Sequence, residues 1–143
     1  MPNDDTIKLL KECNAGVKMG ISGIERVIEY AQDDKLKNIL QDTLTKHKAI
    51  EEATHSKLND YHDTEKDPNA MAEMMSSLKI NFKMMTPTDE EIADLMIDGC
   101  NMGIKSVSRY LNQYPTALPE IREMTERLVK LEQDLMNDLR PYL

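Results

Sequence analysis

Residues 13–18 of the chain read Cys-Asn-Ala-Gly-Val-Lys, and residues 100–105 read Cys-Asn-Met-Gly-Ile-Lys. The two segments share Cys, Asn, Gly and Lys, and both hold a β-branched residue before the Lys. Each copy lies in a stretch whose apolar residues recur at spacings of three and four, and a second such stretch follows each copy. That spacing is typical of helices in a bundle. The repeat therefore predicts a chain built from two copies of a helix hairpin.

The apolar pattern and the local end signals predict four long helices. The expected helices span about residues 5–31, 34–61, 89–114 and 119–140. Thr88 and Glu91 have the spacing of a capping box at the start of the third helix, and Pro119 suits the first turn of the fourth. Gly16, Gly20 and Gly23 each lower the stability of the first helix by up to ~1 kcal/mol relative to Ala. We therefore expect a neighbouring helix to approach closely there.

The link between the two hairpins decides the topology. It spans residues 62–88, and within it residues 70–85 carry a helical pattern rich in Met. A helix of that length spans about 24 Å, which is most of the length of a bundle. This favours hairpins at 5–61 and 89–140 related by a pseudo-two-fold axis. We predict an all-α, ferritin-like four-helix bundle of two duplicated hairpins with a long helical crossover, as a single domain over residues 1–143.

Charge and hydropathy limit the partners. A net charge of −8 argues against nucleic acid and anionic membranes, because both bind basic surfaces. No apolar run approaches the roughly 18 residues of a membrane span, and the N-terminus lacks the basic and apolar regions of a signal peptide. We expect a cytoplasmic protein in which Cys13 and Cys100 are reduced, half-buried thiols.

The second predicted helix carries side chains with the spacing of metal ligands. Glu52 and His55 lie three residues apart and so face one side of a helix, and His47 and Glu51 precede them by one turn. Carboxylates and imidazoles bind iron and other divalent metals. These four residues are the candidate metal ligands of the chain.

The remainder of a di-metal centre is missing from the pattern. If the first hairpin folds back at its turn, Asn14 is the inward-facing neighbour of Glu52 and His55, and Asn101 takes the equivalent place in the second hairpin. The fourth helix contains no His. A neutral amide is a weaker metal ligand than a carboxylate. We therefore expect no bound cofactor, and we expect Asn14 and Asn101 to make buried hydrogen bonds across the symmetry axis.

This layout resembles the ferritin-like superfamily. More narrowly, residues 9–16 (Leu-Leu-x-x-Cys-Asn-x-Gly) and the Ser-Leu-Lys at 77–79 are similar to an uncharacterised bacterial family, the domain of unknown function 2383. The resemblance implies a four-helix bundle with no assigned activity. The chain departs from the carboxylate set of ferritin-like oxidases at both Asn positions and in the fourth helix, which argues against oxidase and iron-storage functions.

These observations favour a non-enzymatic interaction or oligomerisation module. We expect a homodimer whose contact surface is the Met-rich helix at 70–85, because its apolar residues must be covered by the bundle or by a partner. The identity of a further protein partner is not encoded in the pattern. The alternative is a metal-binding or redox protein that holds iron or another divalent metal in a partial site at Glu52 and His55.

Overall fold

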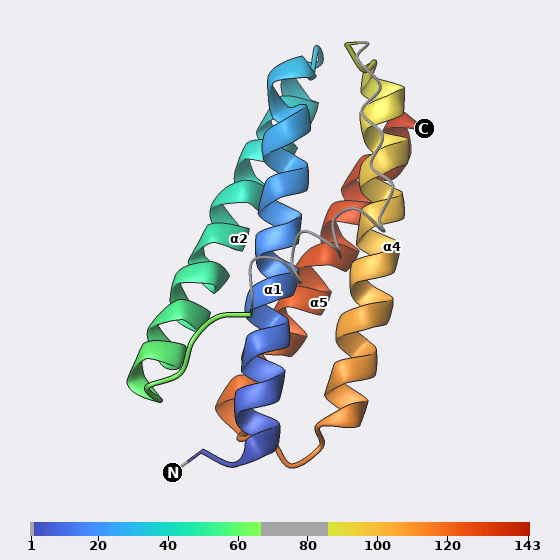
Figure 1. The fold of residues 1–143 in the computed structure, drawn as a ribbon. Helices are drawn as coiled ribbons and strands as arrows, with labels where there is room; N and C mark the ends of the chain where they lie inside the picture. Colours follow the sequence, from blue (N-terminus) through green and yellow to red (C-terminus); the bar gives the residue numbers. More distant parts are fainter. Residues whose placement is uncertain (1, 67–85) are drawn as a thin grey trace.

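The computed structural model describes residues 2–66 and 86–143. These residues form four long helices without any strand, as Figure 1 shows: α1 (Asp4–Val27), α2 (Asp34–Asp60), α4 (Asp89–Gln113) and α5 (Pro119–Leu139). Short 3-10 turns extend α1 and α5 at Ile28–Tyr30 and Arg140–Tyr142. The predicted all-α four-helix bundle is confirmed, and the ends of the helices lie close to the predicted ones.

Local end signals position these helices as expected. Thr88 and Glu91 form the predicted capping box at the start of α4, and Pro119 lies in the first turn of α5. Asn3 and Asp33, whose side chains accept hydrogen bonds from the first-turn backbone, cap α1 and α2. Within 2–66 and 86–143, no helix combines the length and the apolar character needed to cross a membrane.

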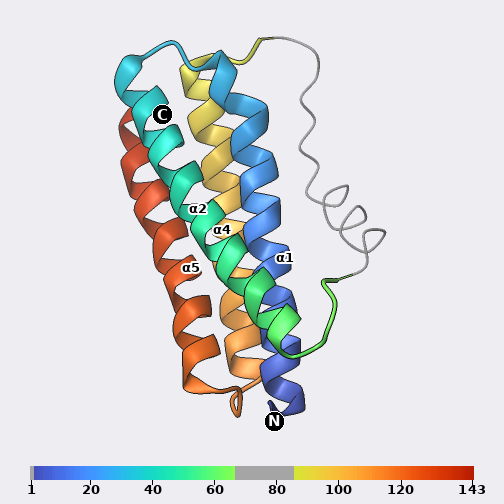
Figure 2. The ribbon, with the colours of Figure 1, turned by 90° about the vertical axis from the view of Figure 1, so that its left-hand side faces the viewer.

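α1 and α5 run in one direction and α2 and α4 run in the opposite direction, as a bundle with one long crossover requires (Figures 1 and 2). α1 and α2 form one antiparallel hairpin and α4 and α5 form the other (Figures 1 and 2). α2 ends at the opposite end of the bundle from the start of α4 (Figure 2). The helix predicted at 70–85 lies outside the described residues.

Each hairpin closes one end of the bundle by hydrogen bonds to the other hairpin. At one end, the Asp5 carboxylate accepts hydrogen bonds from the backbone N and the hydroxyl of Thr116, at 3.1 and 2.6 Å. At the other end, the Asp89 carboxylate accepts hydrogen bonds from the backbone N of Gln32 and Asp33, at 2.8 and 3.0 Å. These contacts fix the two hairpins against each other along the bundle axis.

The core is a set of buried stripes whose residues recur at steps of three and four, the spacing of helices that cross at a small angle. The stripe of α2 is Leu36, Leu40, Thr43, His47, Ile50, Thr54 and Leu58. The stripe of α5 is Ile121, Thr125, Leu128, Glu132, Leu135 and Leu139. Leu131 and Glu51 are only half-buried, while their neighbours Glu132 and Ile50 are buried. The stripe of α2 thus includes His47, and the stripe of α5 includes Glu132.

The two asparagines of the repeat have different surroundings. Asn14 is buried, and its Nδ2 donates a hydrogen bond to Oγ1 of Thr54 on α2 at 2.9 Å. The buried hydrogen bond predicted for Asn14 is therefore confirmed, with a different partner. Asn101 is exposed, so its predicted inward position is wrong. Among the described helices, α1 packs against α2, α4 and α5, whereas α4 packs chiefly against α1 and α5.

This difference predicts unequal effects of the same substitution at the two repeat positions. Asn14→Ala should lower the free energy of unfolding by about 1–3 kcal/mol, because it removes a buried hydrogen bond and leaves Thr54 without its donor. Asn101→Ala should change it by no more than about 0.5 kcal/mol, as for other surface positions. Urea denaturation of both variants measures this, and equal losses would contradict the placement of Asn101.

Candidate functional site

Two ionisable side chains meet in the middle of the bundle. His47 of α2 is completely buried, and its Nε2 lies 2.5 Å from Oε1 of Glu132 on α5. On the other side of the ring, Nδ1 lies 2.7 Å from the backbone carbonyl oxygen of Thr43, one helical turn earlier. A carbonyl oxygen only accepts, so Nδ1 carries a proton, and the contact from Nε2 to Oε1 needs a second proton between the two atoms. The pair is therefore neutral overall, with one proton shared between imidazole and carboxyl.

Two glycines lie at the same level of the bundle as this pair. A Cβ atom added to Gly20 of α1 would stand 2.8 Å from Cδ2 of His47, and one added to Gly103 of α4 would stand 3.9 Å from Oε2 of Glu132. We call Gly20, His47, Gly103 and Glu132 the central polar layer. The close approach predicted for the glycines of α1 is confirmed at Gly20, which leaves room for the imidazole. Among the described residues no such approach occurs at Gly23, where an added Cβ would have no neighbour within 4 Å.

Beside the central polar layer lies a groove of about 220 Å³ between α1, α4 and α5. All five glycines of the chain line it. Its remaining described walls are mainly apolar side chains: Met19, Leu95, Met96, Met102, Val107, Leu128 and Val129. Glu132 lines the groove from α5, so the buried pair has one side in the core and the other against this cavity.

Both cysteines are buried free thiols, so the predicted absence of a disulfide is confirmed, although burial exceeds the half-buried expectation. Burial raises the pKa of Cys13 to about 12. Burial also raises the pKa of Cys100, and the neighbouring Glu132 carboxylate, to which the thiol is hydrogen-bonded, raises it further. Thiols with raised pKa values stay protonated near neutral pH and are poor nucleophiles.

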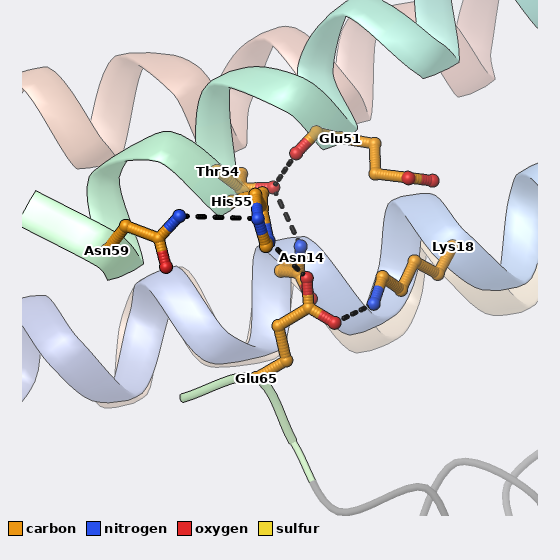
Figure 3. Close-up of polar contacts among 7 residues, drawn as sticks. All are labelled: Asn14, Lys18, Glu51, Thr54, His55, Asn59 and Glu65. Carbon is orange, nitrogen blue, oxygen red and sulfur yellow. Dashed lines mark hydrogen bonds and ion pairs between the residues drawn. The ribbon is translucent and has the colours of Figure 1, made fainter. Parts of the chain in front are cut away.

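The predicted metal ligand His55 lies on the surface in a separate polar network (Figure 3). Its Nδ1 lies 2.8 Å from Oε1 of Glu65, and its Nε2 lies 3.3 Å from Nδ2 of Asn59. Glu65 also forms an ion pair with Lys18 of α1. Both ring nitrogens of His55 thus have protein partners, and the network ties residue 65 to the two helices of the first hairpin.

The structure does not bring the four predicted metal ligands together. His47 is in the core, Glu51 is half-buried, and Glu52 and His55 are exposed. His47 and His55 are separated by about 12 Å along the helix, whereas the ligands of one ion lie within about 2 Å of it. Among the described residues, no three or more His, Cys, Asp or Glu side chains are placed to hold a metal ion. Binding of a metal by fewer of these residues stays a prediction.

Glu132, Gly20 and Gly103 were not identified as site residues from the sequence. For Glu132 a signal was present, because alternating steps of four and three from Ile121 pass through residue 132 on the way to Leu139. The apolar Leu131 beside it conceals that signal.

Comparisons with known proteins show the fold. No protein-family model matches the chain, and no curated protein matches it. The chain is similar to the crystal structure of a conserved hypothetical protein from Mycobacterium tuberculosis, with a TM-score of 0.74 and 12% identity over 100% of both chains. It is also similar to a DUF305 fragment from Deinococcus radiodurans, with a TM-score of 0.73 and 11% identity over 98% of this chain and 95% of that chain.

Both neighbours support an all-α bundle of this arrangement and assign no activity. Neither is described as a member of domain of unknown function 2383 or as ferritin-like. The coarser resemblance, to a helical bundle from uncharacterised families, is therefore supported, and the narrower one is not.

The buried pair predicts strong coupling between His47 and Glu132. His47→Leu or Glu132→Leu alone should lower the free energy of unfolding by about 3 kcal/mol, because each leaves an unpaired polar group in the core. The double variant should lower the free energy of unfolding by clearly less than the sum of the two single losses, since it leaves no unpaired polar group in the core. A double-mutant cycle by chemical denaturation tests this, with the exposed Glu52→Leu as a control near zero. Additive losses would show that the two side chains do not interact.

The central polar layer also predicts opposite effects of Gly→Ala substitutions. Gly99→Ala in α4 should raise stability by up to ~1 kcal/mol, because Ala favours helix and its Cβ would meet no atom of residues 2–66 or 86–143 within 4 Å. Gly20→Ala should lower stability, because its Cβ would stand 2.8 Å from the His47 ring and displace it from Glu132. Thermal unfolding of both variants measures the sign of the change in stability. A stabilised Gly20→Ala protein would contradict the position of the His47 ring.

Proposed function

We propose that this bundle is a non-enzymatic binding module and that the groove between α1, α4 and α5 is its recognition site. The observation that carries the proposal is the cavity of about 220 Å³ with its mainly apolar walls and one buried carboxylate. Binding sites for small molecules are typically concave and apolar, with few polar groups that fix orientation. An engineered apolar cavity of about 150 Å³ in another protein holds benzene. The groove therefore has room for a small organic molecule.

The glycines support a role for the groove beyond packing. Each glycine inside a helix lowers stability by up to ~1 kcal/mol relative to Ala. Gly20 is required by its contact with His47, but at Gly23 and Gly99 an added Cβ would meet no described residue within 4 Å. Packing among the described residues does not require glycine at these two positions. Glycine at these two positions keeps the groove wide and lowers the stability of the helices. Binding sites commonly carry such a loss of stability.

We also propose a ferritin-like origin for the bundle, supported by its topology. Ferritin-like proteins place metal ligands on facing helices in the middle of the bundle, with a Glu from each of two helices. Here the middle of the bundle holds the central polar layer, in which α1 and α4 contribute Gly20 and Gly103 in place of carboxylates. Removal of ligand side chains from two helices turns a metal-sized site into a wider cavity. No observation on the described residues favours the metal-binding alternative over the proposed binding module.

A neutral apolar probe tests the groove directly. All five glycines line the cavity, and glycine amide signals are well separated in a ¹⁵N–¹H spectrum, so they report occupancy. Titration with 2-phenylethanol should shift these signals saturably, with a Kd in the millimolar range, or about −4 kcal/mol. Gly99→Leu should abolish the shifts by filling the groove.

The matched control is Asn101→Leu, which adds the same side chain to an exposed position of α4 that does not line the groove. This variant should bind the probe as the parent chain does. Shifts that never saturate, or that survive Gly99→Leu, would overturn the assignment of the groove as a binding site.

A further inference from the structure

We infer that the groove binds an uncharged small molecule, an alcohol or a phenol, whose O–H group donates a hydrogen bond to Oε2 of Glu132 and whose apolar body lies between α1 and α4. This inference rests on the proposed function of the groove and adds the chemical class of its ligand.

The carboxylates that line the groove in the described part of the chain, Glu12 and Glu132, are both compensated by a protein group. Both oxygens of Glu12 lie near Nζ of Lys66, at 2.9 and 3.1 Å. Glu132 shares a proton with His47 across a distance of 2.5 Å, so this pair has no net charge. The described walls of the groove therefore offer no uncompensated charge to a ligand, and an ionic ligand of either sign would find no counter-charge there.

Although Glu132 is compensated, one of its oxygens can still accept a hydrogen bond from a ligand. The shared proton lies on the side of Oε1, which faces His47, so Oε2 carries no proton whichever partner holds it. Oε2 lies beside Gly103, where the missing side chain leaves room in the groove. The Cys100 thiol donates to this carboxyl group, but a thiol is a weak donor, and each carboxyl oxygen has two lone pairs. Oε2 is therefore an acceptor with remaining capacity in a mainly apolar wall.

A neutral donor matches this arrangement better than the other ligand classes. A cation or an anion would leave water for a mainly apolar groove without gaining a counter-charge, and an unpaired charge in such surroundings is costly. A molecule without any donor would cover Oε2 and leave it with the weak thiol donor, and a buried acceptor without a good partner is unfavourable. An alcohol or phenol satisfies Oε2 and buries no charge, while its hydrocarbon part contacts the apolar walls.

Three probes with the same carbon skeleton test the inference on the full-length chain. 1-Phenylethanol should bind about tenfold more tightly than acetophenone, because the alcohol donates to Oε2, whereas the ketone oxygen would face it as a second acceptor. 1-Phenylethylammonium, in which a charged donor replaces the hydroxyl, should bind more weakly than the alcohol, because the His47–Glu132 pair supplies no net counter-charge. The readout is the saturable shift of the glycine amide signals.

Substitutions at Glu132 locate the hydrogen bond. In Glu132→Leu the alcohol should lose its tenfold advantage over the ketone, because the acceptor is gone. Glu132→Gln should restore the advantage: its NH₂ group donates to Nε2 of His47, and its carbonyl oxygen then takes the place of Oε2 as the acceptor. The matched control is Glu126→Leu, which changes an exposed carboxylate of the same helix at a position that does not line the groove. It should leave all three affinities unchanged.

The outcomes separate this inference from the proposed function. Equal affinities for the alcohol and the ketone on the parent chain would overturn the ligand class and leave the groove as a binding site. Tighter binding of the ammonium than of the alcohol would also overturn it, because it would show a net negative charge in the groove. The absence of saturable binding by every probe would overturn both proposals.

The variants decide the role of Glu132 in the same way. An alcohol advantage that persists in Glu132→Leu, or that Glu132→Gln fails to restore, would overturn the assignment of Oε2 as the acceptor. If Glu132→Leu does not fold, the double variant His47→Leu/Glu132→Leu replaces it, since it leaves no unpaired polar group in the core. The order of affinities among the three probes on the parent chain needs no variant.

Discussion

The proton shared between His47 and Glu132 constrains the rest of the bundle. The carbonyl of Thr43 holds the other ring nitrogen, so the imidazole can point only towards α5. A buried pair of this kind contributes little net stability, because desolvation offsets the attraction. Its consequence is specificity: sliding α2 against α5 by one turn would leave two buried polar groups without partners, which costs several kcal/mol. The pair therefore fixes the register between the two hairpins, as buried polar residues do in coiled coils.

The groove is a geometric consequence of that pair. The imidazole occupies space that a side chain at residue 20 would need, so α1 carries Gly20 at this level. On the other side of Glu132, Gly103 leaves the second carboxylate oxygen next to open space. Glycines on both α1 and α4 remove the side chains that would otherwise fill the region between the two helices. A polar contact needed for register thus also creates a cavity with a carboxylate in its wall, which links the stability of the core to the chemistry of the proposed site.

Local features of the sequence predicted most of the fold, and features that depend on distant neighbours were missed. Helix ends can be predicted from capping residues such as Thr88 and Glu91, because these residues lie within one helical turn of each other in the sequence. Folding the first hairpin back at its turn places Asn14 level with α2 residues near 54, and the hydrogen bond to Thr54 confirms that register. The spacing in α5 points to residue 132, but a Glu is acceptable in a core only when a partner faces it, and that partner is on the other hairpin. Asn101 shares its motif with Asn14 but is exposed, whereas Asn14 is buried.

The candidate metal site failed to form one cluster for a reason that lies in helix geometry. Residues at steps of four rotate by about 40° per step around an α-helix, so His47, Glu51 and His55 drift by about 80° in two turns. The buried stripe of α2 compensates this drift with a step of three, from His47 to Ile50. His47 consequently stays in the core and faces α5, whereas His55 has rotated to the surface, where it binds Glu65. The two histidines therefore act separately: one orients a buried carboxylate beside the groove, and the other holds the start of the crossover against the first hairpin.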